Sequence, residues 1–265
     1  MVLDEILERK RKEVNELKEK TPLTALIKQA KSFKIKRRSF KQALTQDRRP
    51  HLICELKKAS PSEGLLRQSF NVGQLAKEFE EAGASAISVL TERHYFLGEP
   101  DYLNQARLAT QIPILRKDFI FDAYQVYETQ LLGADAFLLI VGLLSNAQLK
   151  ELMGIAKEFN LDVLVEVHTE EELNRAVEAG SEIIGINNRN LETLKTDLSV
   201  SERLIAHVPK NAVTVAESGI ETPEEIERYE RLGIHAFLVG TSLMKSKNIK
   251  EKISELINGA RDGKS

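Results

Sequence analysis

The sequence predicts an α/β fold, a closed (β/α)8 TIM barrel preceded by an N-terminal helical extension. Two observations lead to this prediction. Eight short apolar runs, rich in β-branched residues, alternate with helix-like stretches, which is the pattern of a parallel sheet covered by helices on its outer face. A glycine-centred repeat also separates helix-like stretches from strands, at a spacing of roughly fifty residues. A chain of 265 residues suits a single barrel of this kind.

The eight apolar runs are the predicted strands. They are Leu52–Lys57, Ala86–Glu92, Ile112–Asp118, Ala136–Val141, Val163–Glu166, Ile183–Asn187, Val213–Glu217 and Ala236–Gly240. Most of them end in a charged or amide residue, and in a barrel the carboxyl ends of the strands surround the mouth that carries the active site. The side chains expected to converge there are Glu55, Lys57, Lys117, Glu166, Asn187 and Glu217.

The repeat marks where helices end and strands begin. It occurs as Ala82-Gly83-Ala84, Leu132-Gly133-Ala134, Ala179-Gly180-Ser181 and Leu232-Gly233-Ile234. Glycine is favoured just beyond a helix end because it enters the left-handed conformation without a Cβ clash. An open, doubly wound sheet uses the same signal. The count of eight strands and the lack of a G-x-G-x-x-G motif after any strand favour the barrel.

The first 48 residues contain no predicted strand. Apolar side chains fall on one helical face in the segment 3–17, a turn follows at Thr21-Pro22, and a second helix-like stretch runs from Leu23 to Lys31. We expect residues 1–48 to cap one end of the barrel, so that residues 1–265 form a single domain, and a separate interaction segment is the alternative. A local basic cluster follows, formed by Lys34, Lys36, Arg37, Arg38 and Lys41.

This basic cluster is interpreted as a solvated face in preference to a nucleic-acid patch. If it lay over the mouth, it would raise the local concentration of an anionic small molecule. The whole chain has 38 Lys and Arg against 40 Asp and Glu, which gives no general attraction to nucleic acid or membrane. No long apolar segment is present, so we expect a soluble, cytoplasmic protein, most simply a monomer.

Cysteine and histidine usage indicates neither a disulfide framework nor a metal centre. Cys54 is the only cysteine, and inside the first apolar run it should pack as a small hydrophobic residue. The histidines show no H-x-x-x-H or comparable ligand spacing, so no metal is expected. They are predicted to be surface or loop residues, and they are His51, His94, His168, His207 and His235.

Strand alternation gives the first indication of chemistry. Glu55 and Lys57 lie two residues apart and therefore share a face, and the mouth is a less costly place for them than the apolar helix layer. A purely structural ion pair is the alternative. Alternation does not decide whether Lys117 or its neighbour Arg116 faces the mouth. Glu166 is the only acidic residue within its strand, so it is either placed for proton transfer or paired with a neighbouring cation.

Small residues after the last two strands indicate phosphate binding. Barrels often hold phosphate between the loops that follow strands seven and eight, where glycine allows close backbone approach. Here these loops begin with Ser218-Gly219 and Gly240-Thr241. Ser60, after the first strand, can add a hydroxyl from across the mouth. Ordinary tight turns use the same residues, but both pairs stand at the expected ordinal positions, which favours a phosphorylated, anionic small-molecule substrate.

Five segments together resemble one known family. They are ELKKASPS at 55–62, LRKDF at 115–119, VEV at 165–167, GINNRNL at 185–191 and AESGI at 216–220. The resemblance is to indole-3-glycerol phosphate synthase of tryptophan biosynthesis, and it covers nearly the whole chain, including the helical extension. It assigns Lys117 to the mouth and Arg116 outward. Asn190 stands where the family often has Asp, and the loop 91–98 differs from familiar versions.

The resemblance implies a cofactor-free ring closure of 1-(2-carboxyphenylamino)-1-deoxyribulose 5-phosphate, with loss of carbon dioxide and water. It implies that Lys117 is the general acid, that Lys57 holds the substrate carboxylate and that Glu166 is the general base or proton shuttle. Glu55, Asn187 and Ser218 would position hydroxyls and tune the lysines. By the same matching, Ser60, Gly219, Gly240 and Thr241 would bind phosphate, Glu217 and Arg189 would brace the site, and Phe96, Phe119, Leu191 and Leu194 would wall the aromatic ring.

Two other functions remain to be distinguished. A Schiff-base aldolase would use Lys117 as a nucleophile, provided that burial and a second cation depressed its pKa. A catalytically idle barrel could instead serve as a partner subunit, although an intact Lys117 and Glu166 favour an enzyme. For the aromatic and leucine residues of the predicted ring wall, ordinary core packing is the competing interpretation.

Overall fold

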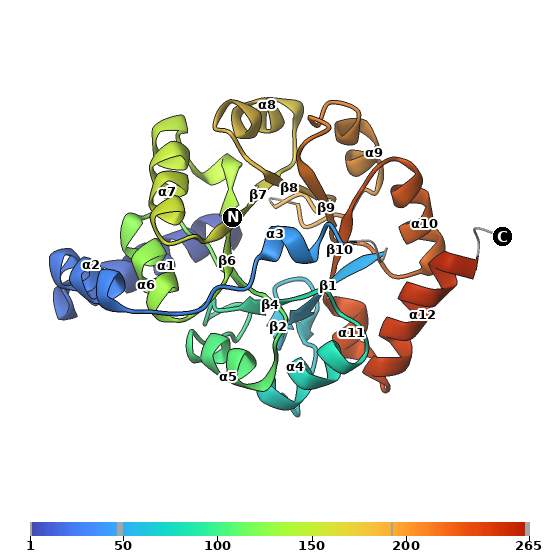
Figure 1. The fold of residues 1–265 in the computed structure, drawn as a ribbon, viewed down its shortest axis with the longest axis horizontal. Helices are drawn as coiled ribbons and strands as arrows, with labels where there is room; N and C mark the ends of the chain where they lie inside the picture. The colour runs from blue at the N-terminus through green and yellow to red at the C-terminus, as the bar shows by residue number, and fades with distance from the viewer. Residues whose placement is uncertain (1, 47–49, 192, 263–265) are drawn as a thin grey trace.

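The computed structural model, which describes residues 2–46, 50–191 and 193–262, is a closed barrel of parallel strands ringed by helices (Figure 1). The order around the barrel is β1-β10-β9-β8-β7-β6-β5-β4, and β1 closes the ring by pairing with both β4 and β10. The predicted fold is therefore confirmed. The barrel strands are β1 (His51–Leu56), β4 (Ala86–Leu90), β5 (Ile114–Lys117), β6 (Ala136–Ile140), β7 (Asp162–Val167), β8 (Ile183–Asn187), β9 (Val213–Glu217) and β10 (Ala236–Val239).

Helices follow the strands and cover their outer face (Figure 1). They are α4 (Val72–Glu81), α5 (Asp101–Ala109), α6 (Ala123–Leu131), α7 (Asn146–Glu158), α8 (Glu170–Glu178), α9 (Ser199–Ile205), α10 (Pro223–Arg231), the short α11 (Thr241–Lys245) and α12 (Ile249–Asp262). Several begin at a side chain that accepts a hydrogen bond from the first turn, which satisfies an otherwise free N–H group. These residues are Asn71, Asp122, Ser145, Thr169 and Thr222.

The four glycines of the sequence repeat lie where they were predicted. Gly83, Gly133, Gly180 and Gly233 each stand two positions after the last residue of a helix, and their φ angles are +100°, +75°, +80° and +99°. Other residue types adopt this left-handed conformation only with strain, so glycine ends the helix and redirects the chain into the next strand.

Strand alternation divides the buried residues between the barrel interior and the helix layer. Cys54 points to the helix layer and is fully buried, as predicted. The interior cluster holds apolar residues that stand two positions before the predicted mouth residues. Ile53 precedes Glu55, Leu115 precedes Lys117, Leu164 precedes Glu166 and Val215 precedes Glu217. Because positions two apart share a face, the four charged side chains continue the interior toward the carboxyl end of the barrel.

The N-terminal extension contacts both ends of the barrel, which corrects the expectation of a cap over one end. Helix α1 (Val2–Lys20) carries Leu3 and Ile6, which lie at the mouth. Helix α2 (Leu23–Ser32) packs against α6. The chain then crosses to the opposite end, where α3 (Phe40–Ala43) lies across the centre of the ring of strands (Figure 1). Phe40 and Leu44 are fully buried against the interior cluster there. The predicted boundary at residue 48 lies outside the described residues.

The basic cluster lies at the end opposite the mouth, so it cannot concentrate a ligand there. Arg37 donates to the carbonyl of Ala134, and the backbone N–H of Arg38 donates to Asp135 at 3.0 Å, both just before β6. The backbone N–H of Lys41 donates to Asp162 at the start of β7, at 2.9 Å. Lys34 and Lys36 are exposed, as a solvated face requires, whereas Arg37 and Arg38 are partly buried anchors.

Two further structural findings concern predictions made from composition. The expectation that all histidines are surface or loop residues is wrong for His51, which is buried in β1 and hydrogen-bonded to Ser85 and to the carbonyl of Gln46. His168 has a specific contact as well, because its Nε2 lies 3.3 Å from Glu166 Oε1. Among residues 2–46, 50–191 and 193–262, no helix has the length and hydrophobicity needed to cross a membrane.

Candidate active site

A cavity of about 280 Å³ opens at the carboxyl ends of the strands. All of the site residues predicted from the sequence line it. They are Glu55, Lys57, Ser60, Phe96, Lys117, Phe119, Glu166, Asn187, Arg189, Leu191, Leu194, Glu217, Ser218, Gly219, Gly240 and Thr241. The sequence analysis missed Leu3 and Ile6 of α1, and also Ser62 and Ser242, which lie beside predicted residues in the loops.

Lys117 occupies the centre of this site. Its Nζ lies 3.0 Å from Glu217 Oε2, 3.7 Å from Glu166 Oε2 and 3.9 Å from Glu55 Oε1, so three strands supply carboxylates to one ammonium group. Burial alone would lower the pKa of Lys117, but the three carboxylates raise it above the ordinary lysine value. Lys117 is therefore held in the protonated form at neutral pH.

Arg116 points in the opposite direction, into the helix layer. Its guanidinium donates to Glu128 at 2.7 Å and to Thr129 at 2.9 Å on α6, and it pairs with Asp118 at 3.3 Å. Arg116 is buried and the Lys117 side chain is 15% exposed, and their carboxylate partners lie on opposite faces of β5.

Glu166 and Glu217 have similar burial but different surroundings. The exposed fraction is 1% for each residue. Burial would raise the pKa of Glu166, but Lys117, a contact with His168 and a 3.0 Å hydrogen bond from Asn187 Nδ2 lower it to about 2. Burial and the charges of Glu166 and Glu55 raise the pKa of Glu217 to about 7, although Lys117 opposes them. The two side chains therefore differ in their readiness to hold a proton.

The third carboxylate belongs to Glu55, which is shared between both lysines. Its Oε2 lies 3.0 Å from Lys57 Nζ, and its Oε1 faces Lys117. Burial raises the pKa of Glu55, but Lys57 and Lys117 outweigh this effect, so the net change is downward and the group is ionised at neutral pH.

On the other side of the cavity, neighbouring side chains pack so closely against the backbone that two positions leave no room for a Cβ atom. A Cβ on Gly240 would lie 2.5 Å from Glu55 Oε2, and one on Gly219 would lie 2.7 Å from Thr196 Cγ2. Ser218 has a φ of +65°, an unusual conformation for a residue with a side chain. These loops bring backbone N–H groups and small side chains together at the rim, an arrangement suited to an anionic group.

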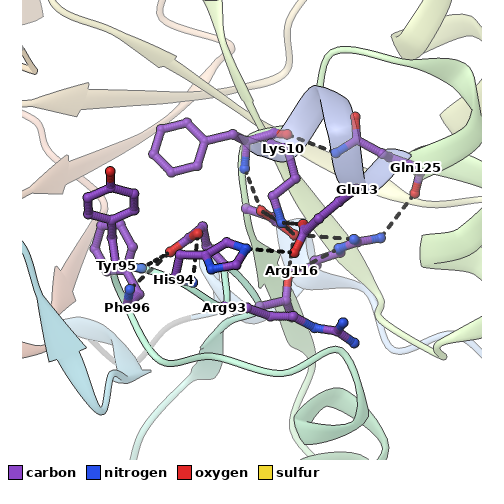
Figure 2. A network of polar contacts seen from close by, with 12 residues as sticks. Lys10, Glu13, Arg93, His94, Tyr95, Phe96, Arg116 and Gln125 are labelled. Carbon is purple, nitrogen blue, oxygen red and sulfur yellow. Dashed lines mark hydrogen bonds and ion pairs between the residues drawn. The ribbon is translucent and has the colours of Figure 1, made fainter. Parts of the chain in front are cut away.

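The apolar wall is fixed by polar contacts outside the cavity. Phe96 and Phe119 line the cavity with their ring centroids 6.4 Å apart. The buried carboxylate of Glu92 accepts hydrogen bonds from the backbone N–H groups of His94, Tyr95 and Phe96 at 2.9, 2.7 and 3.0 Å (Figure 2). This loop therefore presents Phe96 in a defined position.

The same network attaches α1 to the barrel (Figure 2). Lys10, although only 5% exposed, lies 3.1 Å from Asp118 and 2.7 Å from Glu13. Glu13 also lies 3.5 Å from His94. Since Asp118 directly follows Lys117, these contacts hold the helix that covers the cavity against the strand that carries the central lysine.

His168 is the main polar residue that sequence reasoning missed. It follows Glu166 by two residues, the spacing used to group Glu55 with Lys57, and this signal was available in the sequence. Its Nε2 lies 3.3 Å from Glu166 Oε1. Among residues 2–46, 50–191 and 193–262, no group of three or more His, Cys, Asp and Glu side chains is arranged to hold a metal ion.

A closed parallel barrel with titratable side chains gathered at the carboxyl ends of its strands is the architecture of a barrel enzyme. Residues 3–256 match the family model described as indole-3-glycerol phosphate synthase, and the chain belongs to this family. It is 46% identical to the indole-3-glycerol phosphate synthase of Caldanaerobacter subterraneus subsp. tengcongensis, over 99% of this chain and 100% of that protein. It is 45% identical to the protein of the same name from Legionella pneumophila, over 97% and 98% of the two chains.

Solved structures show the fold at greater distance. Thiamine phosphate pyrophosphorylase from Pyrococcus furiosus superposes with a TM-score of 0.63 at 16% identity, covering 84% of this chain and 98% of that one. At this level of identity the similarity concerns the barrel alone.

Proposed function

We propose that the chain is an indole-3-glycerol phosphate synthase that converts 1-(2-carboxyphenylamino)-1-deoxyribulose 5-phosphate into indole-3-glycerol phosphate, carbon dioxide and water. Family membership supports this proposal, and one observation carries the chemistry. Lys117 is a partly buried ammonium group within 4 Å of three carboxylates, in a cavity that also contains Lys57. Ring closure needs such an acid, because negative charge develops on the ribulose carbonyl oxygen as the aromatic carbon attacks.

We assign the first steps to the two lysines. Lys117 donates a proton to the carbonyl oxygen while the new carbon–carbon bond forms. Lys57, paired with Glu55 at 3.0 Å, holds the carboxylate of the substrate until carbon dioxide leaves from the same ring carbon. The electron pair of the broken bond restores the aromatic ring.

Dehydration then requires a base and an acid. Glu166, whose pKa is about 2, is ionised and can accept the proton that is lost. Lys117, after it has regained a proton from solvent, protonates the departing hydroxyl, which leaves as water, and Asn187 and Ser218 position the hydroxyl groups. Glu217, with a pKa of about 7, and Arg189 brace the site.

The remaining predicted residues are assigned to binding. We propose that Ser60, Gly219, Gly240 and Thr241 hold the phosphate, at the rim where the backbone is most accessible. The apolar ring of the substrate would lie against Phe96, Phe119, Leu191 and Leu194. We further propose that residues 1–265 act as one domain, working as a monomer in the cytoplasm.

The decisive experiment is direct turnover. The purified protein, incubated with the carboxyphenylamino sugar phosphate, should generate indole fluorescence, and the chain itself contains no tryptophan to obscure it. Lys117→Ala should lose nearly all turnover, whereas Lys58→Ala, which changes a lysine outside the cavity, should retain it. Lack of product with the wild-type protein would refute the proposal, and normal turnover by Lys117→Ala would refute the assigned acid.

A Schiff-base aldolase is less consistent with the site. Covalent attack by Lys117 needs a neutral amine, whereas the surrounding carboxylates raise the pKa of Lys117. Borohydride trapping with substrate would reveal a covalent adduct on Lys117 if the aldolase mechanism operated. The turnover assay also tests the alternative of a non-catalytic partner subunit, because such a subunit would form no product.

A further inference from the structure

The two oxygens of the Glu166 carboxylate have different surroundings. Oε1 accepts the hydrogen bond from Asn187 Nδ2 at 3.0 Å and also lies 3.3 Å from His168 Nε2. Oε2 lies 3.7 Å from Lys117 Nζ. Asn187 and His168 therefore both engage Oε1, and this arrangement turns Oε2 toward the central lysine.

His168 is itself fixed from the other side. Its Nδ1 lies 3.3 Å from Glu172 Oε2, and the same oxygen accepts the backbone N–H of His168 at 2.7 Å. Glu172 lies in the first turn of α8, whose N-terminus is capped by Thr169. A Cβ on Gly142 would lie 2.8 Å from Glu172 Oε1, so the glutamate is confined between α8 and the turn after β6.

From this chain of contacts we propose that His168, held by Glu172, is a positioning residue that fixes Glu166 with Oε2 directed to the substrate and keeps that carboxylate ionised. The inference rests on the proposed function, because it gives Oε2 the role of proton acceptor. His168 does not line the cavity, so it acts through Glu166 and not on the substrate.

The charges around the pair support an imidazolium at position 168. Burial would lower the pKa of His168, but Glu166 and Glu172 raise it to about 10. Glu166 in turn faces Lys117 from β5, Asn187 from β8, and the carboxylates of Glu55 on β1 and Glu217 on β9. Two carboxylates thus repel Glu166, and Lys117 and His168 supply opposing charge.

The proposal makes the charge of His168 measurable. In protein labelled with 15N-histidine, the His168 imidazole should remain doubly protonated through pH 8.5. Glu172→Gln removes one neighbouring negative charge and should lower the His168 pKa by roughly 1 unit or more. In that variant kcat should be near the wild-type value below the new pKa and should fall as pH rises through the same midpoint.

Two substitutions of His168 distinguish the effect of its N–H donor from the effect of its positive charge. His168→Leu should lower kcat by about tenfold or more with KM changed less than about twofold, because a proton-transfer group is disoriented while the binding surface stays intact. His168→Gln retains a donor for Oε1 and should recover part of kcat. His207→Gln, a change of an exposed histidine, is the matched control and should have no effect.

Several results would overturn the inference. They are a wild-type His168 that titrates near pH 6.5, a His168→Leu variant with kcat unchanged, or a Glu172→Gln variant whose His168 midpoint moves while its kcat profile does not. If His168→Leu fails to fold, Glu172→Gln still tests the proposal. A wild-type protein without turnover would refute the proposed function instead. In that case Glu166→Gln would still test the contact between His168 and Glu166, because loss of the carboxylate should lower the His168 pKa.

Discussion

Replacing Glu217 by Gln should stabilise the folded protein at alkaline pH. The carboxylate is 1% exposed, and burial together with the charges of Glu166 and Glu55 raises its pKa from 4.5 to about 7. One pKa unit corresponds to about 1.4 kcal/mol, so ionising Glu217 costs the folded state about 3 kcal/mol. Gln has nearly the same shape as the protonated glutamate and avoids this cost.

The sign of the pH dependence follows from the direction of the change in pKa. A carboxyl with a raised pKa contributes stability below its unfolded-state pKa, and this contribution is lost as pH rises through the folded-state pKa. Relative to wild type, Glu217→Gln should therefore be about 3 kcal/mol more stable at pH 8.5 and differ by well under 1 kcal/mol at pH 4.5. Equilibrium urea unfolding, followed by far-ultraviolet circular dichroism, measures both differences.

Glu166→Gln is the matched comparison, because the pKa of Glu166 changes in the opposite direction. Lys117, His168 and Asn187 lower it to about 2. The contribution of Glu166 to the free energy of unfolding is present above pH 4.5 and is lost as pH falls toward 2. Glu166→Gln should therefore be about 3 kcal/mol less stable than wild type at both pH 8.5 and pH 4.5. A Glu217→Gln protein that is no more stable than wild type at pH 8.5, or equally stabilised at both pH values, would refute the reasoning.

Three further substitutions test other parts of the structure. Lys10→Met removes a buried contact to Asp118 and should cost about 2 kcal/mol in urea unfolding, and an unchanged midpoint would contradict the anchoring role of α1. Phe40→Ala leaves a cavity at the end opposite the mouth and should cost roughly 3–5 kcal/mol while KM stays unchanged; an altered KM would contradict the separation of the two ends. Gly240→Ala should lower kcat/KM on the order of 100-fold by displacing Glu55, and steady-state kinetics at wild-type level would show that the carboxylate moves without consequence.

The fold could be predicted because its signals are local. Each strand is a short apolar run, and each glycine of the repeat sits beside the helix that it ends, at a φ that favours glycine. The positions of the mouth residues followed from the same alternation, since a side chain two residues beyond an interior apolar residue faces the same way. The resemblance to a known family then predicted roles for these residues, which alternation leaves open.

The orientation of β5 could not be predicted from local pattern. Arg116 and Lys117 are adjacent cations, and the partners that distinguish them lie elsewhere in the chain. Arg116 contacts Glu128 on α6, whereas Lys117 contacts Glu217, one hundred positions away. The same reason explains the extension. Amphipathic spacing predicts its helices, but the contact of Arg38 with Asp135, just before β6, places the last part of the extension at the end of the barrel opposite the mouth.

The three carboxylates around Lys117 show how one geometry yields different chemistry. Glu55, Glu166 and Glu217 are all buried and come from equivalent positions on three strands, so burial does not distinguish them, and Glu217 is the one nearest to Lys117, at 3.0 Å. They differ in the donors that each receives besides Lys117. Lys57 contacts Glu55, and Asn187 and His168 contact Glu166. The pKa of Glu217, where burial and two like charges outweigh Lys117, is the one that rises. A histidine or an amide beside the end of one strand can thus keep one carboxylate ionised while an equivalent carboxylate on another strand has a raised pKa.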